Sequence, residues 1–307
     1  QAKYAVVVGY TKSYLDGRRY SVRVQETRLG NLSADANLWY ANKILEGTAK
    51  VDVSLKNGGG IRSSIGIERL NEAGEIETLP PAAFGTLGGA NNAISQGHLE
   101  STFRFDNGLV VVDVTTAELK DLLENGLRMV GDDNSPGEFP QVGGMRFEFD
   151  ASYASRTAAG NGERVRKLVL LNNDGSDGTV LVENGSVLDE NIKIKLVSLN
   201  FLVNGGDGYP FDSLSAPNRT NLYSGQMYGD PQDFPDGDLT KDPGLNNSFS
   251  VTGGEQDAFA EYFLAFHNTQ EKAYNQNESA PENDQRIKRL DSGSVAGGSS
   301  EFNCPIP

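Results

Sequence analysis

Residues 51–62 read VDVSLKNGGGIR, and this run joins a strand signature to a glycine-rich turn. Val51, Val53 and Leu55 alternate with other residues, which is typical of a β-strand. Consecutive glycines let backbone N–H groups approach a ligand closely, and such groups suit anions. Arg62 adds a planar, charged fork for a phosphate or carboxylate. The run therefore predicts an anion-binding turn at the end of a strand, and the missing Gly-Lys-Ser/Thr excludes a P-loop.

A second glycine-rich turn follows another predicted strand, Ile192 to Leu199, and reads NGGDGY over residues 204–209. It ends in the aromatic residue Tyr209. Phe139 lies in a further predicted loop, residues 137–141, which reads GEFPQ. Aromatic rings exposed on loops are candidates for clamping a flat base. The alternative for each ring is a loop anchor packed on the core.

The remaining pattern mixes strands and helices without strict alternation. Strands are predicted at residues 4–8, 109–114, 145–149 and 165–171, and helices at residues 31–47, 115–127 and 259–266. We expect an α+β fold with a mixed β-sheet and flanking helices. Residues 66–97 and 213–254 are interpreted as insertions, the first of them as a surface excursion. Residues 291–307, rich in Ser, Gly and Pro, are interpreted as a tail or linker.

The composition restricts the class of ligand. The chain has 42 acidic and 27 basic residues, a net charge of -15, which disfavours nucleic-acid polymers and anionic membrane surfaces. A small anion remains compatible, because one or two arginines suffice to hold it. No apolar run approaches the length of a membrane span. Cys304 is the only cysteine, so an internal disulfide and a zinc–cysteine cluster are excluded.

Motifs in a fixed order resemble the C-terminal, substrate-binding domain of the 5'-nucleotidase and UDP-sugar hydrolase family. They are ETRLGNLSADA at 26–36, NGGGIR at 57–62, FDN at 105–107, GEFPQVGG at 137–144 and LNFLVNGGDGY at 199–209. Arg286 and Ile287 resemble the family's closing motif, with Gln285 in place of its glycine. The resemblance implies one nucleotide-binding domain over residues 1–290.

The same resemblance implies roles for individual residues. Phe139 and Tyr209 would sandwich the base, Arg62 would contact the anionic part of the substrate, and Asn107 lies in a second binding segment. A second arginine, expected near the helix that follows Val114, has no counterpart there. The implied substrate-binding set is Asn57, Gly58, Gly59, Gly60, Arg62, Asn107, Phe139, Gly206, Asp207, Tyr209 and Asp212.

The family's chemistry implies a partner domain. A metallophosphoesterase domain, N-terminal in the same parent chain, would hold a divalent metal pair such as Zn or Mn and activate water. This chain holds only His98 and His267, which lack metal-ligand spacing and are expected to be surface or capping residues. We therefore expect no catalytic or metal-binding residue and no cofactor in this chain, and no activity from it alone. An extracellular or periplasmic location is implied by the family.

Other interpretations stay open at this point. The fold could serve as a non-catalytic interaction module with a degraded nucleotide site, which the missing second arginine favours. The parent protein could also act on cyclic nucleotides or nucleotide sugars. Closely spaced carboxylates at Asp230, Asp233, Asp236, Asp238 and Asp242 raise the further possibility of calcium binding, although the spacing is not that of an EF-hand.

Overall fold

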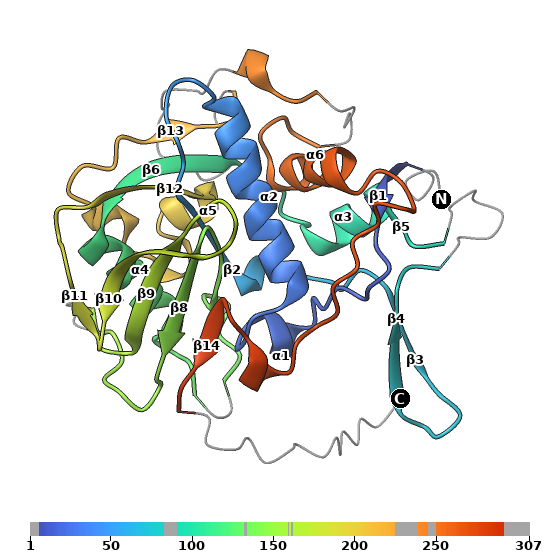
Figure 1. The fold of residues 1–307 in the computed structure, drawn as a ribbon, viewed down its shortest axis with the longest axis horizontal. Coiled ribbons are helices and arrows are strands. Elements are labelled where there is room, and N and C mark those ends of the chain that lie inside the picture. Colours follow the sequence, from blue (N-terminus) through green and yellow to red (C-terminus); the bar gives the residue numbers. More distant parts are fainter. Residues whose placement is uncertain are drawn as a thin grey trace.

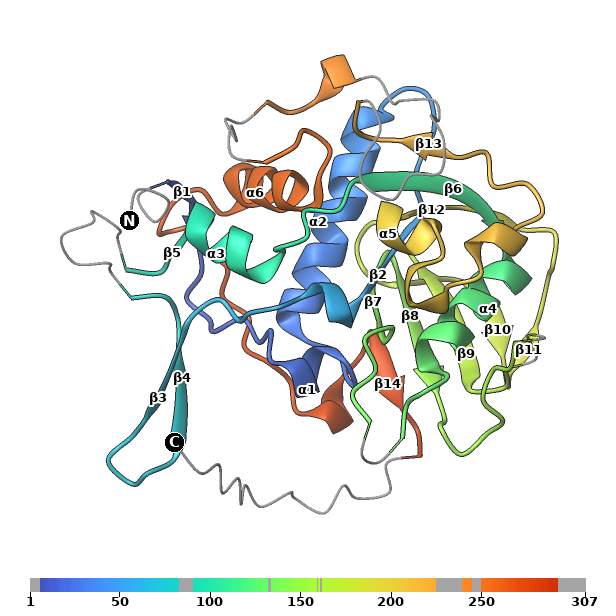
Figure 2. The ribbon, with the colours of Figure 1, turned by 180° about the vertical axis from the view of Figure 1, so that it is seen from behind.

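A computed structural model of the chain describes residues 6–82, 91–131, 134–158, 160, 162–224, 239–244 and 250–291. Most of the chain is built around two five-stranded sheets, with one long helix running past both (Figures 1 and 2).

The first sheet has the order β13-β6-β12-β2-β7. Its strands are β2 (Val53–Asn57), β6 (Leu109–Thr115), β7 (Pro140–Gly143), β12 (Lys193–Leu199) and β13 (Thr220–Asn221). The strands β12 and β2 pair in parallel, whereas the other pairs are antiparallel. Both predicted glycine turns follow the central parallel pair, since η2 (Gly58–Gly60) comes after β2, and α5 (Asn200–Val203) with η4 (Gly206–Gly208) comes after β12. The parallel pairing thus brings the two turns to the same edge of the sheet.

The second sheet has the order β11-β10-β9-β8-β14. It contains β8 (Met145–Phe149), β9 (Val165–Leu171), β10 (Asp177–Glu183) and β11 (Ser186–Val187), which pair with one another in antiparallel fashion. The last strand, β14 (Ile287–Arg289), adds in parallel to β8. Residues close to the end of the described chain therefore complete this sheet.

Helices pack against these sheets and against one another. The long helix α2 (Arg28–Ile44) contacts α6 (Glu255–Phe266), β7 and β2, and α4 (Thr116–Leu127) lies between β6 and β9. A capping box begins α4, because Thr115 accepts from the backbone N–H of Glu118 while the Glu118 carboxylate accepts from that of Thr115. A second apolar core forms around α6, α3 (Gln96–Thr102) and the short sheet of β1 (Val7–Tyr10) and β5 (Ala93–Ser95).

The segment 66–97 is only partly the surface excursion that we expected. The hairpin of β3 (Ile67–Leu70) and β4 (Ile76–Leu79) projects from the body of the molecule (Figures 1 and 2). In contrast, β5 is buried against β1, because its apolar side chains join the second core. Residues 213–254 include η5 (Phe211–Ser213) at their start, then β13 and η6 (Leu239–Lys241).

The expected fold class is confirmed, since the chain is α+β with mixed sheets and flanking helices. The short elements α1 (Arg19–Val22) and η7 (Pro281–Asn283) complete the described chain. Within the described residues, no helix combines the length and apolarity required to cross a membrane. The expected tail, residues 291–307, lies almost entirely outside the described residues.

Candidate functional site

The two glycine turns lie against each other. The side-chain amide of Asn57, at the end of β2, donates a 2.6 Å hydrogen bond to the carboxylate of Asp207 in η4. The backbone carbonyl of Asp207 accepts from the Asn125 side chain of α4 at 3.3 Å. Asp207 has φ of 52°, and the preceding Gly205 has φ of 88°. Left-handed backbone of this kind favours glycine, which explains Gly205 and also Gly208, whose φ is 68°.

The first glycine turn serves close packing rather than presentation of its amides. The N–H groups of Gly58 and Gly59 donate to the carbonyls of Phe139 and Gly137, both at 2.7 Å. A Cβ atom on Gly58 would lie 1.9 Å from the Val22 carbonyl oxygen, so no larger residue fits. The expectation that these two amides face an anion was therefore wrong, because neighbouring backbone already occupies them.

The two aromatics expected to clamp a base are buried. Phe139 is 0% exposed and packs edge-on against Phe149, with ring centroids 6.2 Å apart. Tyr209 is 2% exposed, and its hydroxyl donates to the Glu138 carbonyl at 2.7 Å. Burial raises the pKa of the Tyr209 hydroxyl well above its usual value. In this arrangement neither ring offers a free face to a base, so the interpretation as core anchors holds for both.

A different aromatic stands exposed beside the first turn. Phe105, between α3 and β6, is 60% exposed. The guanidinium of Arg62 lies 5.8 Å from the centre of its ring, within reach of a cation–π contact. The Arg62 backbone N–H donates to the carbonyl of Thr102 at 2.9 Å, which ties the turn to the end of α3. An exposed ring and an exposed cation are thus held side by side.

Arg23 is the second cation of this region, and no sequence motif predicted its role. Its side chain is only 7% exposed, its Nε has no hydrogen-bond partner, and among the described residues no ion pair neutralises it. A 3.5 Å contact from Nη1 to the Ser135 carbonyl is its one hydrogen bond within those residues. Desolvation lowers the pKa of its guanidinium, the charges of Arg19 and Arg62 lower it further, and the nearby carboxylates of Asp207 and Glu138 act in the opposite direction. Since a buried cation without an ion-pair partner is costly, this arrangement favours a negatively charged ligand.

Three other predicted site residues are Asn107, Gly206 and Asp212. Asn107 is half-buried, and its backbone carbonyl accepts from the N–H of Glu255 at 2.9 Å. A Cβ on Gly206 would lie 2.4 Å from the Phe201 carbonyl oxygen, so this position also requires glycine. Asp212 is exposed on η5, and within the described chain no hydrogen bond joins its side chain to either turn. The structure gives no support for Asp212 beside the turns.

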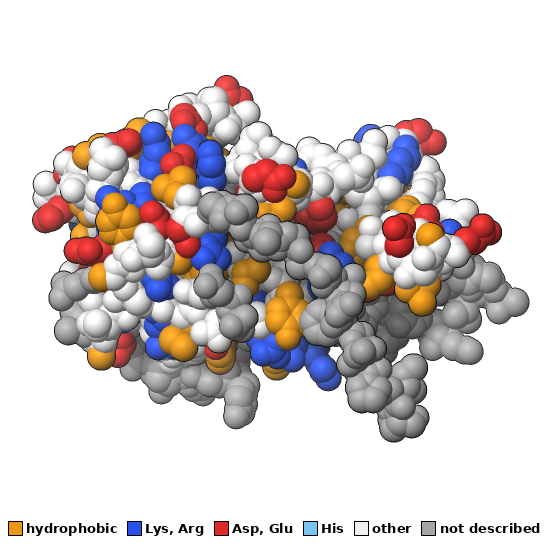
Figure 3. Space-filling view, turned by 90° about the horizontal axis from the view of Figure 1, so that it is seen from below, with side chains coloured by type: hydrophobic (Ala, Val, Ile, Leu, Met, Phe, Trp, Pro, Cys, Tyr) orange, Lys and Arg blue, Asp and Glu red, His pale blue; other side chains and the backbone are white. Residues whose placement is uncertain are grey.

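The surface near these residues is mixed in charge, since Arg19, Arg23 and Arg62 lie near the carboxylates of Asp207 and Glu138. The helix α1, which begins with Arg19, lies toward the lower edge of the molecule in Figure 1. Seen from below, basic side chains lie next to exposed hydrophobic ones (Figure 3). Such a mixed surface suits a ligand with one charged end and one apolar, flat end.

Both histidines act as helix caps. His98 Nδ1 accepts from the backbone N–H of Ser95 at 3.1 Å in the capping box of α3, and burial lowers its pKa to about 4. His267 is the C-cap of α6, and its ring contacts the Lys272 carbonyl at 2.8 Å. The histidines thus behave as the capping residues that we expected.

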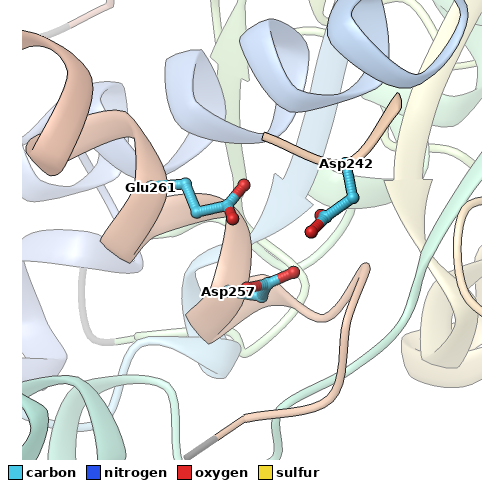
Figure 4. Close-up of side chains that lie close together, drawn as sticks. All are labelled: Asp242, Asp257 and Glu261. Atoms are coloured by element: carbon cyan, nitrogen blue, oxygen red, sulfur yellow. The ribbon is translucent and has the colours of Figure 1, made fainter. Parts of the chain in front are cut away.

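One acidic cluster is formed among the described residues, by Asp242, Asp257 and Glu261 (Figure 4). Ligand oxygens of the three lie within 4.8 Å of one another, and the Tyr40 hydroxyl donates to Asp242 at 2.6 Å. Asp242 belongs to the acidic run considered for calcium. The other members of that run, Asp230, Asp233, Asp236 and Asp238, lie outside the described residues.

Comparison with known proteins identifies the family of the chain. Residues 7–213 match the family model described as "5'-nucleotidase, C-terminal domain". The trifunctional nucleotide phosphoesterase protein YfkN of Bacillus subtilis is 32% identical over 202 residues, 66% of this chain and 11% of that protein. Human 5'-nucleotidase is 32% identical over 206 residues, again 66% of this chain and 30% of that protein.

A solved structure extends the comparison to the fold. The 5'-nucleotidase precursor of Thermus thermophilus matches 94% of this chain with a TM-score of 0.61 and 24% identity, over 40% of its own length. The chain therefore spans less than a third of each of the two relatives and less than half of this structure.

Proposed function

This chain belongs to the 5'-nucleotidase C-terminal domain family, and we propose from that membership that it recognises the nucleotide substrate of a metal-dependent phosphoric-ester hydrolase. In this role it would serve nucleotide catabolism. The observation that carries the proposal is the buried guanidinium of Arg23, which has no ion-pair partner among the described residues and lies near Arg62 and the exposed ring of Phe105.

Each part of a nucleotide has a matching group. Arg23 and Arg62 supply charge-assisted hydrogen bonds for the phosphate, and these bonds are shorter and stronger than neutral ones. Phe105 supplies a free aromatic face, and stacking of a base on such a ring contributes about 1–3 kcal/mol. Asn107 and the joined pair Asn57–Asp207 supply amide and carboxylate groups for the sugar hydroxyls. Phe105 takes the place that Phe139 had in the sequence-based expectation.

The bond-breaking chemistry is proposed to reside outside this chain. A metallophosphoesterase domain of the same parent protein, with a Zn or Mn pair, would activate the attacking water. Binding energy from the base and sugar, collected by this domain, would then orient the phosphate toward those metals. We propose an extracellular or periplasmic location for the parent protein on the basis of its family.

A non-catalytic module with a degraded site is the second candidate. It was favoured by the missing arginine near α4, but Arg23 supplies a second cation from another part of the chain. Nucleotide sugars and cyclic nucleotides are further candidate ligands, because they share the base and carry phosphate. Titration with AMP, cyclic AMP and UDP-glucose would rank these substrate classes.

The decisive test removes one exposed ring at a time. Phe105→Ala is expected to weaken AMP and adenosine by roughly 5- to 150-fold, since about 1–3 kcal/mol of stacking is lost. The matched control is Phe266→Ala, which removes a ring of similar exposure (46% against 60%) from the far end of α6. Titration calorimetry measures both. Equal AMP affinity in the Phe105 and Phe266 variants would reject Phe105 as the base-binding residue.

A further inference from the structure

The loop that carries Phe105 is fastened by the first turn of α6. The N–H of Glu255 donates to the Asn107 carbonyl at 2.9 Å, and that of Gln256 donates to the Asp106 carboxylate at 3.1 Å. The Gln256 side chain donates to the Phe103 carbonyl at 2.9 Å. Because the first N–H groups of a helix have no partners within it, they are available to hold a neighbouring loop. Here the two backbone N–H groups hold the loop after Phe105, and the Gln256 side chain holds it before Phe105.

Asp106 makes the central contact of this attachment. Its second carboxylate oxygen accepts from the N–H of Val251 at 3.3 Å, so the side chain bridges the segment before α6 and the helix itself. Its φ is 45°, in the left-handed region that L-residues other than Asn and Asp seldom adopt. The backbone turn that directs Phe105 outward is therefore combined with a side chain that fixes it to α6.

A buried ion pair ties the same turn of α6 to the first glycine turn. The ammonium of Lys56, which directly precedes Asn57, is paired with the Glu255 carboxylate, and the two side chains are 0% and 1% exposed. The Lys56 ammonium also lies 4.5 Å from the centre of the Phe103 ring. Since an unpaired charge in the interior is strongly unfavourable, the pair holds β2 and α6 in one relative position.

We propose that the first turn of α6, acting through Asp106, is a positioning element that sets the Phe105 ring relative to Arg62 for recognition of the base. Asp106 itself touches no ligand in this scheme and is a positioning residue. The inference rests on the proposed nucleotide-binding function and deepens it. It assigns a role to α6, which lies beyond the residues 7–213 that match the family domain.

Two substitutions of Asp106 test this role. Asp106→Gly accommodates a φ of 45° and removes both hydrogen bonds, whereas Asp106→Asn keeps an oxygen acceptor for the N–H of Gln256. We expect Asp106→Gly to weaken AMP and adenosine by about tenfold, because the loop loses two hydrogen bonds to a charged acceptor that hold it against α6 and the segment before it. Ribose 5-phosphate, which has no base, should keep its affinity. Asp106→Asn should bind all three ligands within about twofold of the unmodified chain, because capping by Asn and Asp is similar.

NMR-detected titrations of the 307-residue chain measure these affinities into the millimolar range. Unchanged AMP affinity in Asp106→Gly would overturn the inference, as would an equal loss for ribose 5-phosphate, which indicates a general structural role. If Asp106→Gly does not fold, Gln256→Met removes the side-chain bond to Phe103 and should show the same split between AMP and ribose 5-phosphate. No AMP binding by the unmodified chain would overturn the proposed function and this inference together, whereas normal binding there isolates the Asp106 result.

Discussion

Replacing Arg23 with methionine is expected to raise the stability of the protein while it weakens nucleotide binding. The guanidinium is 7% exposed, its Nε has no partner, and its one hydrogen bond within the described residues is a 3.5 Å contact to Ser135. Methionine has a similar length and no polar group to desolvate. If Arg23 served folding alone, its replacement would lower the stability of the protein.

The magnitudes follow from the burial of Arg23. A buried polar group without its partner costs about 1–3 kcal/mol, and a charged one costs more. Relief of that cost should raise Tm by roughly 1.5–5 °C, since an unfolding entropy of about 2.1 cal/mol/K per residue means that 1 kcal/mol moves the Tm of a 307-residue chain by about 1.5 °C. A hydrogen bond from a charged donor contributes about 1.5–3 kcal/mol, so AMP affinity should fall roughly 10- to 150-fold.

Circular dichroism on heating gives Tm, and titration calorimetry gives the AMP affinity. Arg19→Met is the control, because Arg19 is exposed and belongs to the same basic group. Its charge is screened by solvent and salt, so we expect AMP affinity within about threefold of the unmodified chain and a Tm change below about 1 °C. A lower Tm for Arg23→Met with unchanged AMP affinity would refute the reasoning and make Arg23 a structural residue.

Two further predictions concern burial. Phe139→Ala is expected to lower the free energy of unfolding by about 3–5 kcal/mol, because the ring is fully buried, and a denaturation curve measures this loss. Burial raises the pKa of Asp257, Glu278 and Asp284 to about 7 each, so the folded state holds these protons more tightly than the unfolded state between about pH 4 and pH 7. Stability should therefore fall as the pH rises through that window. Tm at pH 5 should exceed Tm at pH 7.5, and Asp257→Asn should reduce the difference; a Tm that rises with pH would contradict the assigned burial.

Local sequence patterns predicted strands, helices and turns of the molecule. The strand predicted at residues 109–114 and the helix predicted at residues 115–127 depend on residues close in sequence, and they occur as β6 and α4. The two glycine turns were predicted together as one site, and the Asn57–Asp207 hydrogen bond joins them. Sequence patterns of this kind predict the structure correctly because the same nearby residues specify the strand, its end and the turn.

The exposure of individual side chains could not be predicted in the same way. Phe139 and Phe105 both lie in short loops, but Phe139 directly precedes β7, whose residues are buried throughout. Arg23 is covered by segments around residues 135–137, more than a hundred positions later in the chain. Burial of this kind depends on tertiary contacts, and the periodicity of apolar residues along the sequence does not reveal these contacts. The one signal for Phe105 was its place beside Asn107 in a motif that was already recognised.

The most direct test of the central claim is a calorimetric titration of the unmodified chain with AMP, without added metal. We predict saturable binding to one site, tighter for AMP than for adenosine, because Arg23 and Arg62 act on the phosphate. No binding of AMP or adenosine up to millimolar concentration would contradict the proposed function of this domain.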